Sequence, residues 1–171
     1  FKDEKINEPQ GIVLRSFPLK DLDIPKSLFA ISRAGAGTNN INISKCSEKG
    51  IVVFNTPGAN ANAVKEMVIC ALILGKRDLV SGNKTIDSIN TEKLSDEEIS
   101  KRIEDMKKAF VGQEIKGKTL SVIGLGAIGS MVAEQAIQLG MHVQGYDPGI
   151  TVETALRLPR DIHVCKKIDD S

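Results

Sequence analysis

The sequence lacks a surplus of charge of either sign. Its 171 residues include 23 lysines and arginines and 22 aspartates and glutamates, for a net charge of +1. A balanced charge gives no electrostatic reason to expect a nucleic acid or an anionic membrane surface as a partner. Hydrophobic residues still make up 41% of the chain, enough for one sizeable core, which excludes intrinsic disorder. We therefore expect a globular protein whose partner is a small molecule.

Long hydrophobic runs and paired cysteines are also missing. The longest apolar run, residues 67–74, is far shorter than the ~20 residues that a membrane-spanning helix requires. The first residues show no apolar stretch that ends in a small-residue cleavage site, so no signal peptide is predicted. The three cysteines form no C-x-x-C pair, and we expect no metal site. Their odd number and wide spacing are typical of reduced, structural thiols in the cytoplasm, at Cys46, Cys70 and Cys165.

Short apolar runs predict three buried strands in the first third of the chain. They cover residues 11–15, 28–32 and 51–54, and each is bounded by glycine, proline, asparagine or a charged residue. Between the second and third runs, residues 42–49 form a short helical pattern that ends at Gly50. This alternation of strand and helix predicts a parallel α/β layer rather than β-hairpins.

Helical patterns follow these strands. A long apolar helix is predicted to begin at Asn62 and to reach about residue 74 or beyond. A further helix begins at Ser95, because Ser95 and Glu98 form the S-x-x-E pattern of a capping box. We place a domain boundary just before the first of these helices.

The pattern with the most chemical content is a strand, a glycine-rich turn, a helix and a second strand. The strands are predicted over residues 119–123 and 141–146, and the turn has the spacing G-x-G-x-x-G. In such a unit the first glycine allows a tight turn, the second lets a pyrophosphate approach the backbone, and the third lets helix and strand pack closely. The helix N-terminus then offers unpaired N–H groups to the phosphates. The three glycines are Gly124, Gly126 and Gly129.

An acidic residue at the end of the second strand completes this motif. Asp147 follows Gly129 after 17 intervening residues, where a carboxylate accepts hydrogen bonds from the adenosine ribose and repels a 2′-phosphate. Residues 148–150 bring no lysine or arginine that would attract such a phosphate. The motif therefore predicts a dinucleotide site that prefers NAD to NADP.

A second glycine-rich loop, residues 33–40, follows the predicted strand 28–32. Successive N–H groups at the carboxyl end of a parallel strand hold a carboxylate well, and Arg33 adds a charge for a second anionic group. An ordinary turn between a strand and a helix explains the same small residues. The loop pattern alone leaves both interpretations open.

Three segments in this order resemble the D-isomer-specific 2-hydroxyacid dehydrogenase family. They are SRAGAGTNNI at residues 32–41, GIVVFNTPGAN at residues 50–60, and GKTL at residues 117–120, just before Gly124. Asn39 stands where many members of the family carry aspartate, which is a mild departure. The resemblance extends over nearly the whole chain.

The resemblance implies an α/β fold with two domains. Residues 1–59 would form a flavodoxin-like substrate-binding domain, and residues 60–171 a Rossmann NAD-binding domain with a helical arm at residues 62–108. Both domains would be incomplete in this chain, because the family's catalytic Arg, Glu and His lie beyond the second Rossmann strand. His142 and His163 do not match the catalytic position. We therefore predict no catalytic residue in this chain.

The resemblance also implies a substrate and its binding residues. The sequence is most similar to members that use NAD to oxidise 3-phospho-D-glycerate to 3-phosphohydroxypyruvate, the first step of L-serine synthesis. The N–H groups of Ala36 and Gly37 would hold the substrate carboxylate, while Arg33 and Arg15 would bind its phosphate. Thr56 would contact the nicotinamide side of the cofactor. The full set of implied cofactor residues is Thr56, Gly124, Gly126, Ala127, Ile128, Gly129 and Asp147.

Two other functions stay open. One is a D-2-hydroxyacid dehydrogenase of the glyoxylate or lactate type, in which Arg33 would bind no phosphate. The other is a non-catalytic, NAD-sensing protein that resembles a transcriptional co-repressor, since one fold hosts several functions. For the enzyme, the family implies a homodimer formed through residues 62–108 in the cytoplasm.

Overall fold

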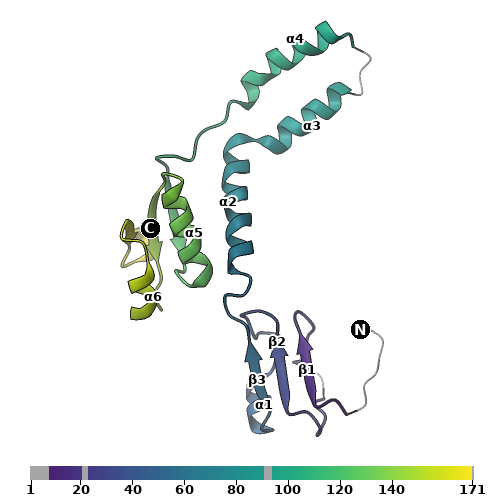
Figure 1. Ribbon diagram of the computed structural model, residues 1–171, viewed down its shortest axis with the longest axis vertical. Coiled ribbons are helices and arrows are strands. Elements are labelled where there is room, and N and C mark those ends of the chain that lie inside the picture. The colour runs from purple at the N-terminus through teal and green to yellow at the C-terminus, as the bar shows by residue number, and fades with distance from the viewer. Residues whose placement is uncertain (1–7, 21–22, 91–93, 171) are drawn as a thin grey trace. The chain divides into compact units, whose positions relative to one another are not determined.

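The computed structural model describes residues 8–20, 23–90 and 94–170. The chain divides into two compact units, Phe1–Asn62 and Ala63–Ser171, and each unit contains a three-stranded parallel sheet. The strands of the first sheet lie side by side in Figure 1. The α/β fold class predicted from the sequence is confirmed.

The first unit is built on the sheet β1-β2-β3. The strands are β1 Gly11–Leu14, β2 Ala30–Arg33 and β3 Val52–Asn55, and all pairs are parallel, as predicted. The second strand begins two residues later than the pattern suggests, because the N–H of Leu28 is taken up in a turn by the carbonyl of Pro25.

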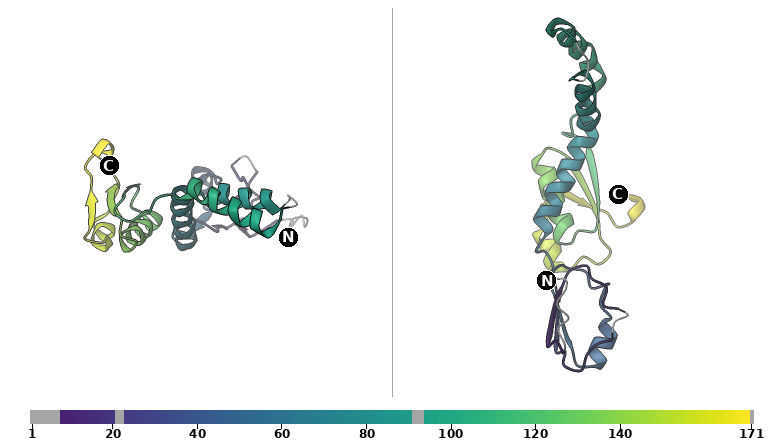
Figure 2. Two further views of the ribbon diagram at one scale, coloured as in Figure 1. Left: turned by 90° about the horizontal axis from the view of Figure 1, so that it is seen from above. Right: turned by 90° about the vertical axis from the view of Figure 1, so that its right-hand side faces the viewer.

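Helix α1, Ile43–Glu48, lies on one side of this sheet (Figure 2, right). The helix forms as predicted, because Oδ1 of Asn42 caps its first turn by accepting a hydrogen bond from the N–H of Lys45. Apolar side chains line the space between helix and sheet, and Ile31 and Cys46 are each only 1% exposed. This core fixes the strand ends from which the loop at residues 33–40 departs.

The second unit contains the sheet β4-β5-β6. The strands are β4 Thr119–Ile123, β5 His142–Tyr146 and β6 Ile162–Val164, and their pairing is parallel throughout. Helix α5, Ala127–Gln138, connects β4 to β5 and buries Ala133 and Ala136 completely. The predicted strand–turn–helix–strand unit is therefore present, and α6, Val152–Arg157, precedes β6.

Three helices lie between the two sheets in the sequence. They are α2 Ala61–Arg77, α3 Leu79–Asn90 and α4 Asp96–Lys107, followed by the 3₁₀ turn Lys108–Phe110. Asp78, with a φ of 46°, separates α2 from α3, and the sequence pattern does not predict this break. No helix in the described part of the chain is both long enough and apolar enough to cross a membrane. A second 3₁₀ turn, Ile168–Asp170, lies near the C-terminus.

Candidate functional site

The glycine-rich turn between β4 and α5 has the backbone geometry that its sequence predicts. Gly124 has a φ of 91°, a left-handed conformation that favours glycine. A Cβ atom at Gly129 would overlap the carbonyl oxygen of Gly124, so only glycine allows the helix to start this close to the strand. At Gly126, by contrast, a Cβ would meet no atom within 4 Å. The space beside the Gly126 backbone is therefore open.

Helix α5 begins without a side-chain cap. Gly126 occupies the capping position, and the first hydrogen bond of the helix runs from the N–H of Ser130 to the carbonyl of Gly126 (3.0 Å). Within the described residues, the N–H groups of Ala127 and Ile128 are bonded to no acceptor. These two groups, at the positive end of the helix dipole, suit a bound phosphate.

Asp147 lies next to this turn, because the register of the parallel strands pairs Ile123 with Tyr146. Its Oδ2 atom accepts a hydrogen bond from the N–H of Leu125 (2.8 Å), and its Oδ1 atom accepts one from the N–H of Gly149 (2.9 Å). The structure thus brings six predicted cofactor residues together in the second unit: Gly124, Gly126, Ala127, Ile128, Gly129 and Asp147.

The seventh predicted cofactor residue, Thr56, belongs to the first unit. It follows β3, and there it bonds to the glycine-rich loop after β2. Its N–H donates to the carbonyl of Gly35 (3.1 Å), and its Oγ1 accepts a hydrogen bond from the N–H of Gly35 (2.7 Å). Thr56 therefore has a structural role in shaping this loop, which its sequence context does not reveal.

The loop at residues 33–40 contains a run of N–H groups without an acceptor. Within the described residues, the N–H groups of residues 36–40 have no hydrogen-bond acceptor, and those of Ala36 and Gly37 are the first two of this run. Arg33 lies against the same loop, because a Cβ at Gly35 would overlap its Nη1 atom. The loop therefore presents main-chain donors, those of Ala36 and Gly37 among them, and one guanidinium group, which together suit a ligand with two anionic groups.

Arg15 contacts the loop at residues 33–40 through its main chain, whereas the prediction concerns its side chain. Its carbonyl oxygen, rather than its guanidinium group, accepts a hydrogen bond from Nε of Arg33 (3.2 Å) and another from Nδ2 of Asn40 (3.1 Å). Asn40 also bonds the carbonyl of Phe17 (2.8 Å). The Arg15 side chain is exposed. The structure does not test the predicted contact between the Arg15 guanidinium and a substrate phosphate.

Two side chains that hold the loop were missed by the sequence analysis, namely Asn40 and Asn55. Nδ2 of Asn55 donates to the carbonyl of Ala36 (2.8 Å), across 19 residues of sequence. Asn55 pairs with Arg33 in the register of β2 and β3, which places it beside the start of the loop. The contact between Asn55 and Ala36 follows from the register of β2 and β3, and the sequence of one strand does not determine that register.

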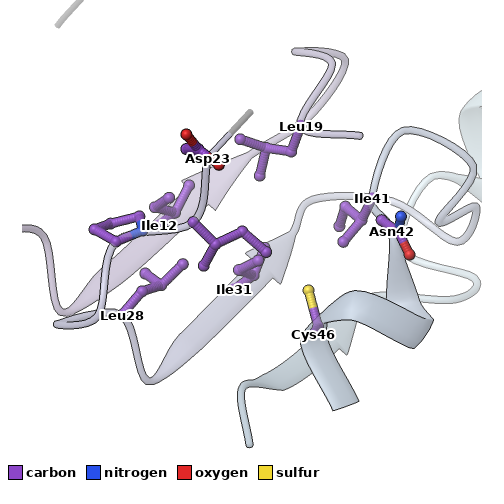
Figure 3. Close-up of a pocket in the computed structure, with 10 residues that line it drawn as sticks. Ile12, Leu19, Asp23, Leu28, Ile31, Ile41, Asn42 and Cys46 are labelled. Carbon is purple, nitrogen blue, oxygen red and sulfur yellow. The ribbon is translucent and has the colours of Figure 1, made fainter. Parts of the chain in front are cut away.

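A small apolar cavity of about 80 Å³ lies elsewhere in the first unit. Ile12 and Ile31 from the sheet and Cys46 from α1 are among the residues that line it (Figure 3). Burial raises the pKa of the Cys46 thiol, and the charge of nearby Lys45 only partly opposes this effect. The thiol is therefore neutral and acts as a packing group. Cys165 is also buried, but Cys70 is exposed, so the expectation of a buried structural role fails for Cys70.

Comparison with known proteins identifies the family. The family model described as "D-isomer specific 2-hydroxyacid dehydrogenase, catalytic domain" matches residues 3–159. The D-3-phosphoglycerate dehydrogenase of Methanocaldococcus jannaschii is 35% identical over 174 aligned residues, which cover 97% of this chain and 30% of that protein. The hydroxypyruvate reductase of Thermotoga maritima is 37% identical over 146 aligned residues, which cover 84% of this chain and 43% of that protein.

Similarity to a solved structure supports the same family assignment. The crystal structure of NAD+-bound 3-phosphoglycerate dehydrogenase from Entamoeba histolytica matches with 31% identity and a TM-score of 0.61, over 94% of this chain and 42% of that chain. The chain spans less than half of the length of each of these three proteins. The glycine turn, the parallel sheets and the family match lead to one conclusion: the chain belongs to the D-isomer specific 2-hydroxyacid dehydrogenase family.

Proposed function

We propose that the protein oxidises 3-phospho-D-glycerate to 3-phosphohydroxypyruvate with NAD+, the first step of L-serine synthesis, in the cytoplasm. The observation that carries the proposal is the loop at residues 33–40. Within the described residues, the unpartnered N–H groups of Ala36 and Gly37 lie in the same short loop as the Arg33 guanidinium. This substrate has a carboxylate at one end and a phosphate at the other, and the loop offers a matching group for each.

The cofactor assigned to the second unit is NAD(H). The open space at Gly126 and the N–H groups of Ala127 and Ile128 fit a pyrophosphate. The carboxylate of Asp147 has capacity left for the ribose hydroxyls and would repel a 2′-phosphate. These residues fit NAD better than NADP.

The described residues bind and orient the substrate in this mechanism. When bound, NAD+ accepts a hydride from C2 of the 2-hydroxy acid. The N–H groups of Ala36 and Gly37 hold the carboxylate attached to C2 and so restrict the position of the reacting carbon. Arg33 pairs with the phosphate. Residues 33–40 contain no group able to take the hydroxyl proton near neutral pH, and we assign the acid–base role to no residue of this chain.

Replacement of Arg33 tests the substrate. A hydrogen bond to a charged group contributes about 1.5–3 kcal/mol, so Arg33→Ala is expected to raise the dissociation constant for 3-phosphoglycerate by about 10- to 150-fold. Calorimetry with NAD+ present measures this constant. Arg160→Ala, at an exposed arginine of the second unit, serves as the control and leaves the constant unchanged. An unchanged constant in Arg33→Ala would rule out phosphate binding by Arg33.

A second candidate is a different D-2-hydroxyacid dehydrogenase. The 37% identity to a protein named hydroxypyruvate reductase favours it. If this chain has that function, Arg33 binds no phosphate and the protein prefers an unphosphorylated acid. Binding of D-glycerate and 3-phosphoglycerate to the same preparation separates the two candidates. The two ligands differ only in the phosphate, and only the first proposal expects the phosphorylated acid to bind more tightly.

A further inference from the structure

The loop after β2 is held at two successive carbonyl groups by residues at the end of β3. The carbonyl of Gly35 accepts a hydrogen bond from the N–H of Thr56 (3.1 Å), and the carbonyl of Ala36 accepts one from Nδ2 of Asn55 (2.8 Å). The first bond joins main-chain atoms and survives most substitutions. The second depends on a side chain, so the identity of residue 55 affects how the Ala36 carbonyl is oriented.

The peptide geometry transmits this orientation to the donors on the opposite side of the loop. In a planar trans peptide unit, the C=O group and the following N–H group point in opposite directions, and the described chain has no cis peptide bond. The Gly35 carbonyl shares its unit with the N–H of Ala36, and the Ala36 carbonyl shares its unit with the N–H of Gly37. Because both carbonyls are bonded to the end of β3, both N–H groups point away from it. Two such N–H groups form an anion-binding concavity.

We propose that Asn55 is a positioning residue for carboxylate binding. Its side-chain amide holds the Ala36 carbonyl and so directs the N–H of Gly37 toward the substrate, which Asn55 itself does not touch. This inference rests on the proposed function, because it takes the anion at Ala36 and Gly37 to be the carboxylate of a 2-hydroxy acid. It adds to that function a residue whose effect is transmitted through the peptide backbone.

Nearby glycines explain why the held peptide needs this hydrogen bond, because Gly37 follows it directly and Gly35 lies one residue before Ala36. Gly35 has a φ of 147°, and glycine at positions 35 and 37 gives the backbone many accessible conformations. Without the Asn55 bond, the peptide between Ala36 and Gly37 is free to rotate, and fewer molecules present both donors together. The apparent dissociation constant is the intrinsic constant divided by the competent fraction of molecules, so it rises as that fraction falls.

Three variants and two ligands test the proposal. Asn55→Leu keeps the approximate size and removes the donor, whereas Asn55→Gln keeps an amide. Asn42→Ala is the matched control, because it removes one asparagine hydrogen bond at α1 of the same unit, to the N–H of Lys45. The ligands are 3-phosphoglycerate and sn-glycerol 3-phosphate, which has the phosphate but no carboxylate. Calorimetry with NAD+ present gives each dissociation constant.

The expected result is selective for the carboxylate. One hydrogen bond corresponds to roughly a tenfold change, so Asn55→Leu raises the dissociation constant for 3-phosphoglycerate about tenfold and leaves that for glycerol 3-phosphate unchanged. In Asn55→Gln, the dissociation constant for 3-phosphoglycerate should lie between those of the unmodified protein and Asn55→Leu. Asn42→Ala should lower the melting temperature but not raise the dissociation constant for 3-phosphoglycerate selectively. Equal weakening of both ligands by Asn55→Leu, or no weakening of either, overturns the role of Asn55.

Amide NMR separates this inference from the proposed function. In the ligand-free protein, Asn55→Gln and Asn55→Leu should shift the amide resonance of Gly37 more than that of Ala36, and equal or absent shifts contradict the positioning role. In the unmodified protein, 3-phosphoglycerate should shift both amides. If it shifts neither, the proposed carboxylate site fails, whatever the variants do.

Discussion

Asp147 accepts two hydrogen bonds from the backbone. The N–H groups of Leu125 and Gly149 each bond one of its carboxylate oxygens. A carboxylate oxygen has two lone-pair positions, so each oxygen keeps capacity for a ribose hydroxyl. The two backbone hydrogen bonds fix the orientation of the Asp147 side chain, which reduces the rotamer entropy that binding of a ribose has to remove.

Asp147→Asn is expected to weaken the binding of NAD+ by about 10- to 100-fold, because a charge-assisted hydrogen bond is lost. Discrimination against NADP+ should also relax, since no negative charge is left to repel the 2′-phosphate. Dissociation constants of both cofactors, measured by calorimetry, check this expectation. Asp161→Asn, at an exposed aspartate before β6, is the control. Unchanged affinity for NAD+ in Asp147→Asn would remove the ribose-binding role from Asp147.

At the scale of single elements, α4 shows how a local pattern determines a helix end. Oε2 of Glu98 accepts hydrogen bonds from the N–H and the hydroxyl of Ser95, both at 2.9 Å. The hydroxyl oxygen of Ser95 accepts one from the N–H of Glu98 (3.4 Å), which completes the predicted capping box. These bonds from Ser95, the backbone bond first, lower the pKa of the Glu98 carboxyl below its ordinary value.

The sign of this pKa shift predicts an acid-sensitive helix end. A carboxyl whose pKa is lower in the folded state stabilises that state above the unfolded pKa, and the effect is lost as the pH falls through the folded pKa. Protection of the first α4 amides from hydrogen exchange should therefore decline below about pH 4.5, near the ordinary pKa of glutamate. Glu98→Gln should remove most of this pH dependence, and Glu97→Gln should keep it. An identical acid response in Glu98→Gln would exclude the capping carboxylate as its cause.

The elements and site residues that could be predicted are those encoded by neighbouring residues. The capping box spans four positions, and the cofactor turn with Asp147 lies within one continuous stretch of chain. The predicted helical arm at residues 62–108 includes α3, but the sequence does not predict the break before it, because this break occurs at Asp78 and not at a glycine or proline. The hydrogen bond from Nδ2 of Asn55 to the carbonyl of Ala36, in the loop at residues 33–40, joins residues that are 19 positions apart. Such a contact depends on the register of the strands.

At the scale of the whole molecule, several helical side chains have no covering surface among the described residues. Leu79 and Val80 on α3 are 54% and 55% exposed, and Met67 on α2 is 69% exposed. Apolar surface of this kind is typical of an interface between protein chains. We propose that a second copy of the chain covers part of it, as the family resemblance implies.

Light scattering after gel filtration tests this dimer. The unmodified chain should elute with about twice its mass of 18.5 kDa, and Leu79→Glu combined with Val80→Glu should shift it toward the monomer. Leu156→Glu is the control, because Leu156 is 82% exposed on α6, outside the proposed interface. A monomeric mass for the unmodified chain, or an equal shift in the control, would refute the interface.

The donors proposed to bind ligands at Ala36, Gly37, Ala127 and Ile128 all belong to the main chain. A main-chain N–H group persists through any substitution that keeps the backbone in place, except replacement by proline, which has no N–H. Tolerance to mutation at these positions should therefore depend on bulk and backbone freedom, with little dependence on side-chain chemistry. The sequence at such positions is able to drift over evolutionary time while the ligand still meets the same donors.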